Sequence, residues 1–122
     1  MNIALWIGQI VLAVVFTASG IAKSTQSKEK LVETGQTGVA VYPKAIVRMT
    51  AYAELLGAIG IIVPWWTGIA PVLTPLAAVG FAAVMIGAIS SHIRLREPRN
   101  IAITTTILII AVLVAIGRFA GL

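Results

Sequence analysis

The sequence predicts an all-α integral membrane protein, a four-helix up-down bundle that forms a single domain over residues 1–122. Only 11% of the residues are charged and 59% are hydrophobic, whereas soluble domains average about 25% charged residues. The apolar residues are concentrated in four segments, residues 3–22, 45–63, 69–91 and 101–117. Each has the roughly 17–25 residues that a transmembrane helix needs, and none alternates in polarity as membrane β-strands do.

The first apolar segment is predicted to be a retained helix and not a cleaved signal peptide. Residues 18–20, Ala-Ser-Gly, resemble a small-residue cleavage site. However, no basic segment precedes the apolar residues, and these extend beyond the roughly 7–15 residues of a signal sequence. We therefore count this segment as the first membrane span.

Residues 24–43 form a long polar connection that is expected to be amphipathic and cytoplasmic. Within it, residues 27–34 predict a short helix that carries Glu29 and Glu33. A connection of this length exceeds what a tight turn between helices requires. It is therefore expected to lie on the bilayer surface or to fold back over the end of the bundle.

The second and third connections are short, which makes neighbouring helices antiparallel. The second contains Trp65 and Trp66, and aromatic residues of this kind are typical of the membrane interface. Pro75 is expected in the first turns of the third helix, where its missing N–H costs little. Helix packing is predicted at small residues, because they let backbones approach closely in lipid; these residues are Gly57, Gly60, Ala83, Gly87 and Ser91.

The basic residues predict the orientation of the protein in the membrane. The first and third connections hold most of them, whereas residues 64–68 hold none. Because basic residues favour the cytoplasmic side, the first and third connections should be cytoplasmic and both termini should lie outside. Arg118 lies near the outer end, and we expect its side chain to extend to that interface.

Glu54 is the most unusual residue of the sequence, because it lies in the middle of the second apolar segment. An ionised carboxylate at that depth costs about 2.5–3.5 kcal/mol, so Glu54 should be paired, protonated or functional. Arg48 lies about 9 Å nearer the cytoplasm along the helix axis. The two residues are rotated by roughly 120° from each other around the helix, so a charged partner of Glu54 should come from another helix.

The candidate functional residues lie near one end of the predicted bundle. Lys23 ends the first helix, Arg48 begins the second and His92 ends the third. We predict Glu54 and His92 as catalytic residues, with Lys23, Arg48 and Met85 as ligand-binding residues. The alternatives are flanking charges for Lys23 and Arg48, a solvated helix-end residue for His92, and a place in the core for Met85. No metal site is predicted, because the chain has no cysteine and shows no cluster of metal ligands.

The sequence resembles the DoxX-like family of small four-helix bacterial membrane proteins. The resemblance is carried by SGIAK at residues 19–23, AELLGAIG at residues 53–60 and PVLTPLAA at residues 71–78, together with Arg48, Pro64, Met85, Ala88 and His92. It implies a multi-pass protein of the bacterial inner membrane. Because some members are linked to thiosulfate:quinone oxidation or to membrane oxidoreductase complexes, it also implies a redox role with a quinone. The lack of cysteine argues against a direct relay of sulfur, and a single histidine excludes two-histidine haem ligation within one chain.

Three functions are consistent with these features of a protein surrounded by lipid. The first is a redox-associated subunit that binds a quinone or a similar lipophilic molecule, in which Glu54 exchanges protons while a cationic residue polarises a ligand oxygen. The second is a non-catalytic accessory or assembly protein of a larger membrane complex. The third is a transporter of protons or a small solute, which would require a homo-oligomer. Nucleic-acid binding is not expected, because the basic connections are short and almost without aromatic residues.

Overall fold

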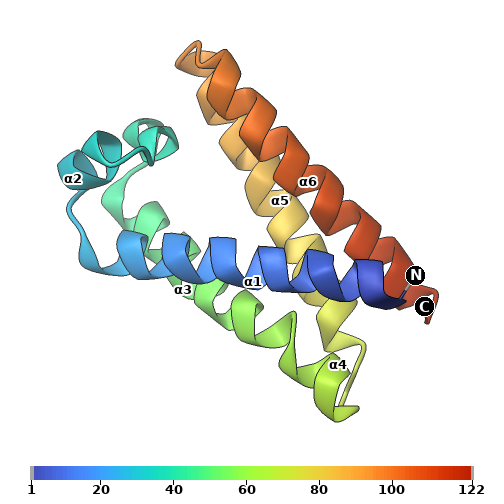
Figure 1. Ribbon diagram of the computed structural model, residues 1–122. Coiled ribbons are helices and arrows are strands. Elements are labelled where there is room, and N and C mark those ends of the chain that lie inside the picture. The colour runs from blue at the N-terminus through green and yellow to red at the C-terminus, as the bar shows by residue number, and fades with distance from the viewer. Residues whose placement is uncertain (1, 122) are drawn as a thin grey trace.

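The computed structural model describes residues 2–121, and the regular structure of these residues is helical (Figure 1). Its long helices are α1 (Asn2–Thr25), α3 (Lys44–Gly60), α5 (Leu73–Arg94) and α6 (Pro98–Phe119). The shorter ones are α2 (Lys28–Glu33), the 3₁₀ helix η1 (Thr37–Val41) and α4 (Val63–Thr67). Four spans are long and apolar enough to cross a membrane, namely α1, α3 together with α4, α5 and α6. This finding confirms the predicted fold class.

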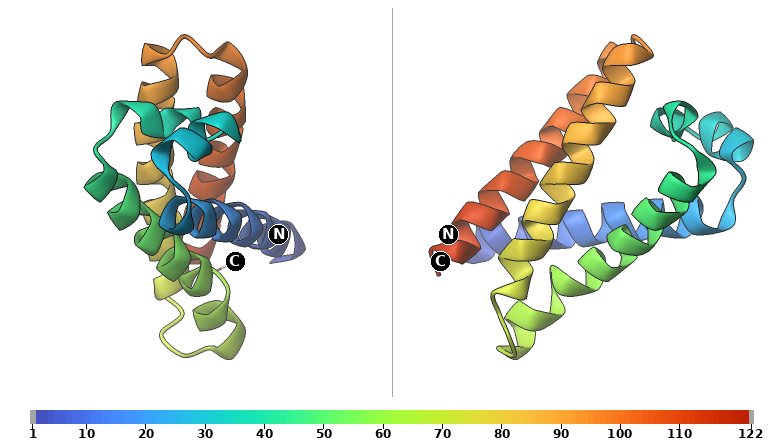
Figure 2. Two further views of the ribbon diagram at one scale, coloured as in Figure 1. Left: turned by 90° about the vertical axis from the view of Figure 1, so that its left-hand side faces the viewer. Right: turned by 180° about the vertical axis from the view of Figure 1, so that it is seen from behind.

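The long helices form two antiparallel pairs, α1 with α3 and α5 with α6. Both pairs converge at the end of the molecule that holds the two termini and α4, here called the terminal end (Figures 1 and 2). They diverge toward the opposite end, here called the loop end, where α2, η1 and the turn between α5 and α6 lie. The up-down order is therefore the predicted one, but the helices splay apart at the loop end instead of forming a closed bundle.

The main hydrophobic core lies where the two pairs cross, and it joins α1, α5 and α6 with the end of α3. Phe16 of α1 stacks on Phe81 of α5, with 3.9 Å between the ring centroids. Gly57 of α3 lies against the same Phe81 ring, so close that a Cβ atom there would fall 2.6 Å from Phe81 Cε1. Gly57 therefore has the packing role that the sequence predicts, because any larger residue would push this ring away.

Substitution of Gly57 by alanine is expected to destabilise the protein by about 1–3 kcal/mol, the usual cost of overpacking a core. The added methyl group would displace the Phe81 ring and disturb its stacking on Phe16. Gly80→Ala is the matched control, because a Cβ atom at that mid-helix glycine would meet no neighbour within 4 Å. Thermal unfolding in detergent should show a loss for Gly57→Ala and none for Gly80→Ala. Equal stabilities of the two variants would contradict the packing role.

Polar side chains from two other helices bind the carbonyl groups at the end of α3. The helix ends at Gly60, and α4 follows after a short break. Gln9 of α1 donates through Nε2 to the Ile61 carbonyl at 2.7 Å. Thr74 of α5 donates through its hydroxyl to the Gly60 carbonyl at 3.0 Å. Because the last carbonyls of a helix lack partners within it, these two bonds fasten the end of α3 to its neighbours.

Arg118, near the end of α6, is buried, so the expectation that its side chain extends to the outer interface is wrong. Only 2% of the residue is exposed. Its Nε donates to Gln9 Oε1 at 2.7 Å, and Nη1 donates to Asn2 Oδ1 at 2.9 Å. The guanidinium also lies over the Trp65 ring, 4.4 Å from the ring centroid. Arg118 thus joins α6 to α1 and α4 at the terminal end.

Candidate functional site

A cavity of about 690 Å³ lies at the loop end, in the space where the two helix pairs diverge. All four long helices and η1 contribute to its wall. The part of the lining nearer the core is apolar and includes Phe16, Val84 and Ile107. The part nearer the loop end is polar and includes Lys23, Gln26, Gln36, Tyr42, His92 and Asn100. The volume falls within the roughly 300–1,000 Å³ that is usual for small-molecule sites.

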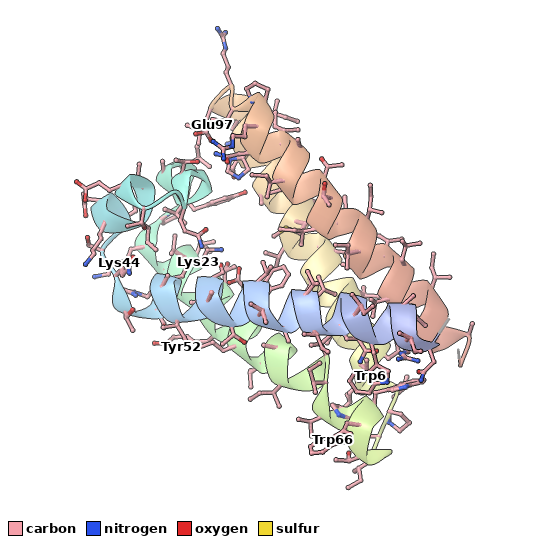
Figure 3. All side chains as sticks on the ribbon, viewed as in Figure 1. Trp6, Lys23, Lys44, Tyr52, Trp66 and Glu97 are labelled. Carbon is pink, nitrogen blue, oxygen red and sulfur yellow. The ribbon has the colours of Figure 1, made fainter. Side chains whose placement is uncertain are left out.

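Lys23 and Glu54 form an ion pair between α1 and α3 beside this cavity. Lys23 Nζ lies 2.7 Å from Glu54 Oε1, and the Glu54 side chain has no exposed surface. Glu54 Oε2 is also buried, and no described residue hydrogen-bonds to it. Lys23 lines the cavity, whereas Glu54 lies outside the lining. The partner of Glu54 thus comes from another helix, as the position of Glu54 around α3 indicates. Figure 3 shows Lys23 toward the loop end of α1.

Arg48 does not pair with Glu54 but binds the end of α1. Its Nη1 donates to the Lys23 carbonyl at 2.6 Å, and Nη2 donates to the Gln26 carbonyl at 3.1 Å. The Lys23 carbonyl lies in the last turn of α1, where partners within the helix are lacking, and Gln26 follows directly after the helix. Arg48 lies outside the cavity lining. It therefore holds the turn of α1 that carries Lys23.

His92 and Glu97 form a second polar pair, at the turn between α5 and α6. His92 Nδ1 lies 2.8 Å from Glu97 Oε1. The same oxygen accepts a hydrogen bond from Thr37 Oγ1 of η1 at 2.8 Å, and Asn100 Nδ2 donates to Thr37 Oγ1 at 3.2 Å. Glu97, labelled in Figure 3 at the far tip of the α5–α6 pair, therefore links this turn to η1.

Residues 34–42, here called the strap, contribute to the wall of the cavity at the loop end. Gln36 Nε2 donates to Ser19 Oγ of α1 at 3.2 Å. The Tyr42 hydroxyl donates to the Gly87 carbonyl of α5 at 3.2 Å. Together with the hydrogen bond from Thr37, these contacts attach the strap to both helix pairs.

The row of small residues on α5 has a place in the site that the sequence did not indicate. Ala83, Gly87 and Ser91 line the cavity, so their small side chains leave space for a ligand. Met85 is 7% exposed, belongs to the main core and also lines the cavity. Its proposed place in the core and its proposed place in the lining are therefore compatible.

The structure brings three of the five predicted site residues into one lining, namely Lys23, Met85 and His92. Glu54 and Arg48 lie outside it and contact Lys23 through its side chain and its backbone. The geometry places a cation and an imidazole among the polar residues of the lining. Within residues 2–121, no group of three or more His, Cys, Asp or Glu side chains could hold a metal ion.

Sequence reasoning missed several polar residues of the site, among them Thr37, Tyr42, Glu97 and Asn100. A signal existed for Glu97, because it is one of only four acidic residues and follows the single histidine by five positions. A hydroxyl or an amide in a surface loop is too common to be singled out. The importance of Thr37, Tyr42 and Asn100 follows from the fold of the strap.

Protonation of Glu97 is expected to loosen the attachment of the strap. Hydrogen bonds from His92 and Thr37 lower the pKa of Glu97 below its ordinary value of 4.5. The carboxylate therefore stabilises the folded state above about pH 4.5, and this contribution is lost as the pH falls through the lowered pKa. Unfolding measured in detergent between neutral and acidic pH should show a steeper acid loss for the wild type than for Glu97→Gln.

The control for this pH dependence is Glu29→Gln, because Glu29 is exposed on α2. This variant should keep the wild-type slope of stability against pH. If Glu97→Gln also kept that slope, the hydrogen bonds to Glu97 would not stabilise the folded protein.

The fold and the cavity define the class of protein. Four spans that are apolar enough to cross a bilayer, with polar side chains around a cavity at one end, make it a multi-pass membrane protein. The chain belongs to the DoxX-like family, which matches residues 7–114. This match confirms the resemblance seen in the sequence. Comparisons with curated proteins and with solved structures find no match.

Proposed function

We propose that this DoxX-like protein binds a quinone or a similar lipophilic small molecule in the cavity and serves as a redox-associated membrane subunit. The observation that carries the proposal is the lining, which changes from apolar side chains near the core to hydrogen-bonding groups at the loop end. A quinone has a matching distribution of polarity, because its ring oxygens accept hydrogen bonds and its tail is apolar. The redox role rests on the resemblance to family members linked to thiosulfate:quinone oxidation, in which a quinone accepts electrons.

Lys23 and His92 are the residues proposed to contact the oxygens of the ligand. They line the cavity from different helix pairs. The Lys23 ammonium has three donors, and the bond to Glu54 Oε1 uses one of them. His92 is bonded to Glu97 through Nδ1, and no hydrogen bond from residues 2–121 engages its Nε2. Lys23 Nζ and His92 Nε2 are thus available to polarise a ligand oxygen or to exchange a proton with it, while Glu54 and Glu97 keep the two side chains in position.

The proposed location is the bacterial inner membrane, with the loop end in the cytoplasm. The basic residues support this orientation, because those in the described chain gather at the loop end except for Arg118. The absence of natural cysteines makes the orientation simple to test with an impermeant thiol reagent on intact cells. Ser27→Cys should be protected and Thr67→Cys labelled. The reverse pattern would contradict this orientation.

The binding proposal is tested by titrating purified protein in lipid nanodiscs with a short-tailed benzoquinone. We expect saturable binding that weakens at least about tenfold in His92→Ala, because a hydrogen bond to the ligand is lost. A similar loss is expected when Lys23→Met and Glu54→Leu are combined, a change that removes the donor without leaving an unpaired charge. Lys44→Met is the matched control, since Lys44 is exposed and lies outside the lining.

Unchanged affinity in both the His92 variant and the double variant would refute the proposed contacts. Failure of the wild type to bind the benzoquinone would favour the alternative of an accessory protein, in which the polar residues only hold the helices together.

A further inference from the structure

Resting on the proposed function, we infer that the cavity selects a ligand with an uncharged head group and that Glu54 and Glu97 determine this selectivity. Each carboxylate is paired with a nitrogen group of the lining. Lys23 Nζ lies 2.7 Å from Glu54 Oε1, and His92 Nδ1 lies 2.8 Å from Glu97 Oε1. The ligands that fit are amphiphiles with a carbonyl or hydroxyl head, and anionic amphiphiles are disfavoured.

The charge balance of the lining supports this selectivity. Of the described residues that line the cavity, Lys23 and His92 are the ones whose side chains can carry a positive charge. Each has a glutamate as its partner, so the two pairs together are neutral when His92 is protonated and carry one negative charge when it is not. An anionic head group would add a further negative charge to a partly desolvated space. Burying such a charge without a free cation costs far more than burying a neutral polar group.

Charges farther from the cavity do not reverse this balance. The guanidinium of Arg48 is bonded to two backbone carbonyls at the end of α1 and lies outside the lining. The basic residues of α2 and of the turn between α5 and α6 stand at the aqueous surface, where salt limits their reach to about 8–10 Å. They can attract anionic lipids to the surface of the protein, but they leave the cavity without a free cation.

Lys23 Nζ and His92 Nε2 both suit an uncharged oxygen atom of the ligand as their partner. Lys23 donates to a carbonyl or a hydroxyl. The hydrogen bonds that lower the pKa of Glu97 keep its carboxylate ionised at neutral pH, so His92 Nδ1 is the donor of that pair. His92 Nε2 then accepts from a hydroxyl when the ring is neutral and donates to a carbonyl when the ring is protonated. Lys23 and His92 can therefore bind either a carbonyl or a hydroxyl head group.

A matched pair of probes tests the inference. Dodecanol and dodecanoate share the same tail and differ in the charge of the head group at about pH 8, where a carboxylic acid is ionised. Each is used to displace a short-tailed benzoquinone from the protein in nanodiscs of neutral lipid. For the wild type, dodecanol should compete at least about tenfold more strongly than dodecanoate.

Two variants and one control identify the residues responsible. Glu54→Gln keeps an oxygen that can accept from Lys23 but removes the negative charge, so the preference for dodecanol should fall by at least about tenfold. Glu97→Gln should reduce the preference in the same direction. Because Glu97 lies outside the spanning helices, this variant still tests the inference if Glu54→Gln does not fold. Glu33→Gln is the control, because Glu33 is exposed on α2, and it should keep the wild-type preference.

The outcomes separate this inference from the proposed function. If the benzoquinone binds but dodecanoate displaces it as strongly as dodecanol does, charge selection is wrong and lipophilic binding stands. An unchanged preference in the folded glutamine variants would also overturn the role of the two glutamates. If the benzoquinone does not bind the wild type, the proposed function fails and the inference fails with it.

Discussion

Lys23→Met is expected to lower the free energy of unfolding by about 3–5 kcal/mol, the range found when one partner of a buried ion pair is removed. The Glu54 carboxylate would then lose the bond to Oε1, while Oε2 already lacks a hydrogen bond from the described chain. The Glu54 side chain has no exposed surface at which water could replace the lysine. The variant would therefore have to protonate Glu54 or open the contact between α1 and α3.

Replacing both partners together, Lys23→Met with Glu54→Leu, should restore much of this stability, because the charge and its partner disappear at once. Lys44→Met places the same substitution at an exposed position and should change stability by less than about 0.5 kcal/mol. Reversible unfolding in mixed micelles, followed by circular dichroism, measures all three variants. A double variant as unstable as Lys23→Met would show that charge compensation is not what the pair contributes.

The spans could be predicted from the sequence because lipid leaves a crossing chain few options. Each span must bond its own backbone groups and be long enough to cross, so the length of an apolar segment nearly determines a helix. The start of the third span shows the limit of this reasoning. The sequence places it at Ile69, whereas α5 begins at Leu73. Gly68 has a φ of 74° and belongs to a turn whose residues are as apolar as those of a helix.

The cavity could not be predicted, because it depends on where two helix pairs touch and where they separate. Gly57 and Gly87 have the same appearance in the sequence, a glycine within an apolar helix. In the structure, Gly57 lies against the Phe81 ring, whereas Gly87 lines the cavity and binds Tyr42 through its carbonyl. Which glycine allows a close contact and which one leaves a space is decided by the residues on the facing helix.

The partner of Glu54 could be predicted only in part. Rotation around the helix excludes Arg48 and requires a residue of another helix. Lys23 and His92 were both available by depth, and choosing between them needs the distances between helices. The structure pairs Glu54 with Lys23 and pairs His92 with Glu97. The sequence does not mark Glu97 as the partner of His92, because Glu97 lies in a connection, where a charged residue is ordinary.

Gln9→Leu is expected to lower the free energy of unfolding by about 2–4 kcal/mol, because it removes both hydrogen bonds of a fully buried side chain. Gln9 has no exposed surface. It accepts from Arg118 Nε at 2.7 Å and donates to the Ile61 carbonyl at 2.7 Å, so one side chain binds α6 and the end of α3. Leucine has a similar size but can make neither bond. Thr17→Val, at an exposed position of α1, is the control and should leave stability nearly unchanged.

Gln9→Glu separates the contributions of the two bonds in the same unfolding measurement. A glutamate oxygen can still accept from Arg118 Nε, but an ionised glutamate cannot donate to the Ile61 carbonyl. The carboxylate oxygen that replaces Nε2 would also repel the Ile61 carbonyl. A loss as large as that of Gln9→Leu would therefore assign the stabilisation to the Ile61 bond, and a smaller loss would assign it to the Arg118 bond. A loss in Gln9→Leu no larger than in Thr17→Val would mean that the two bonds of Gln9 add no stability to the other contacts between the helix pairs at the terminal end, such as Leu5 against Gly117. With the polar bonds in place, the pairs are held together at the terminal end, which leaves the loop end as the place where they can stand apart around a ligand.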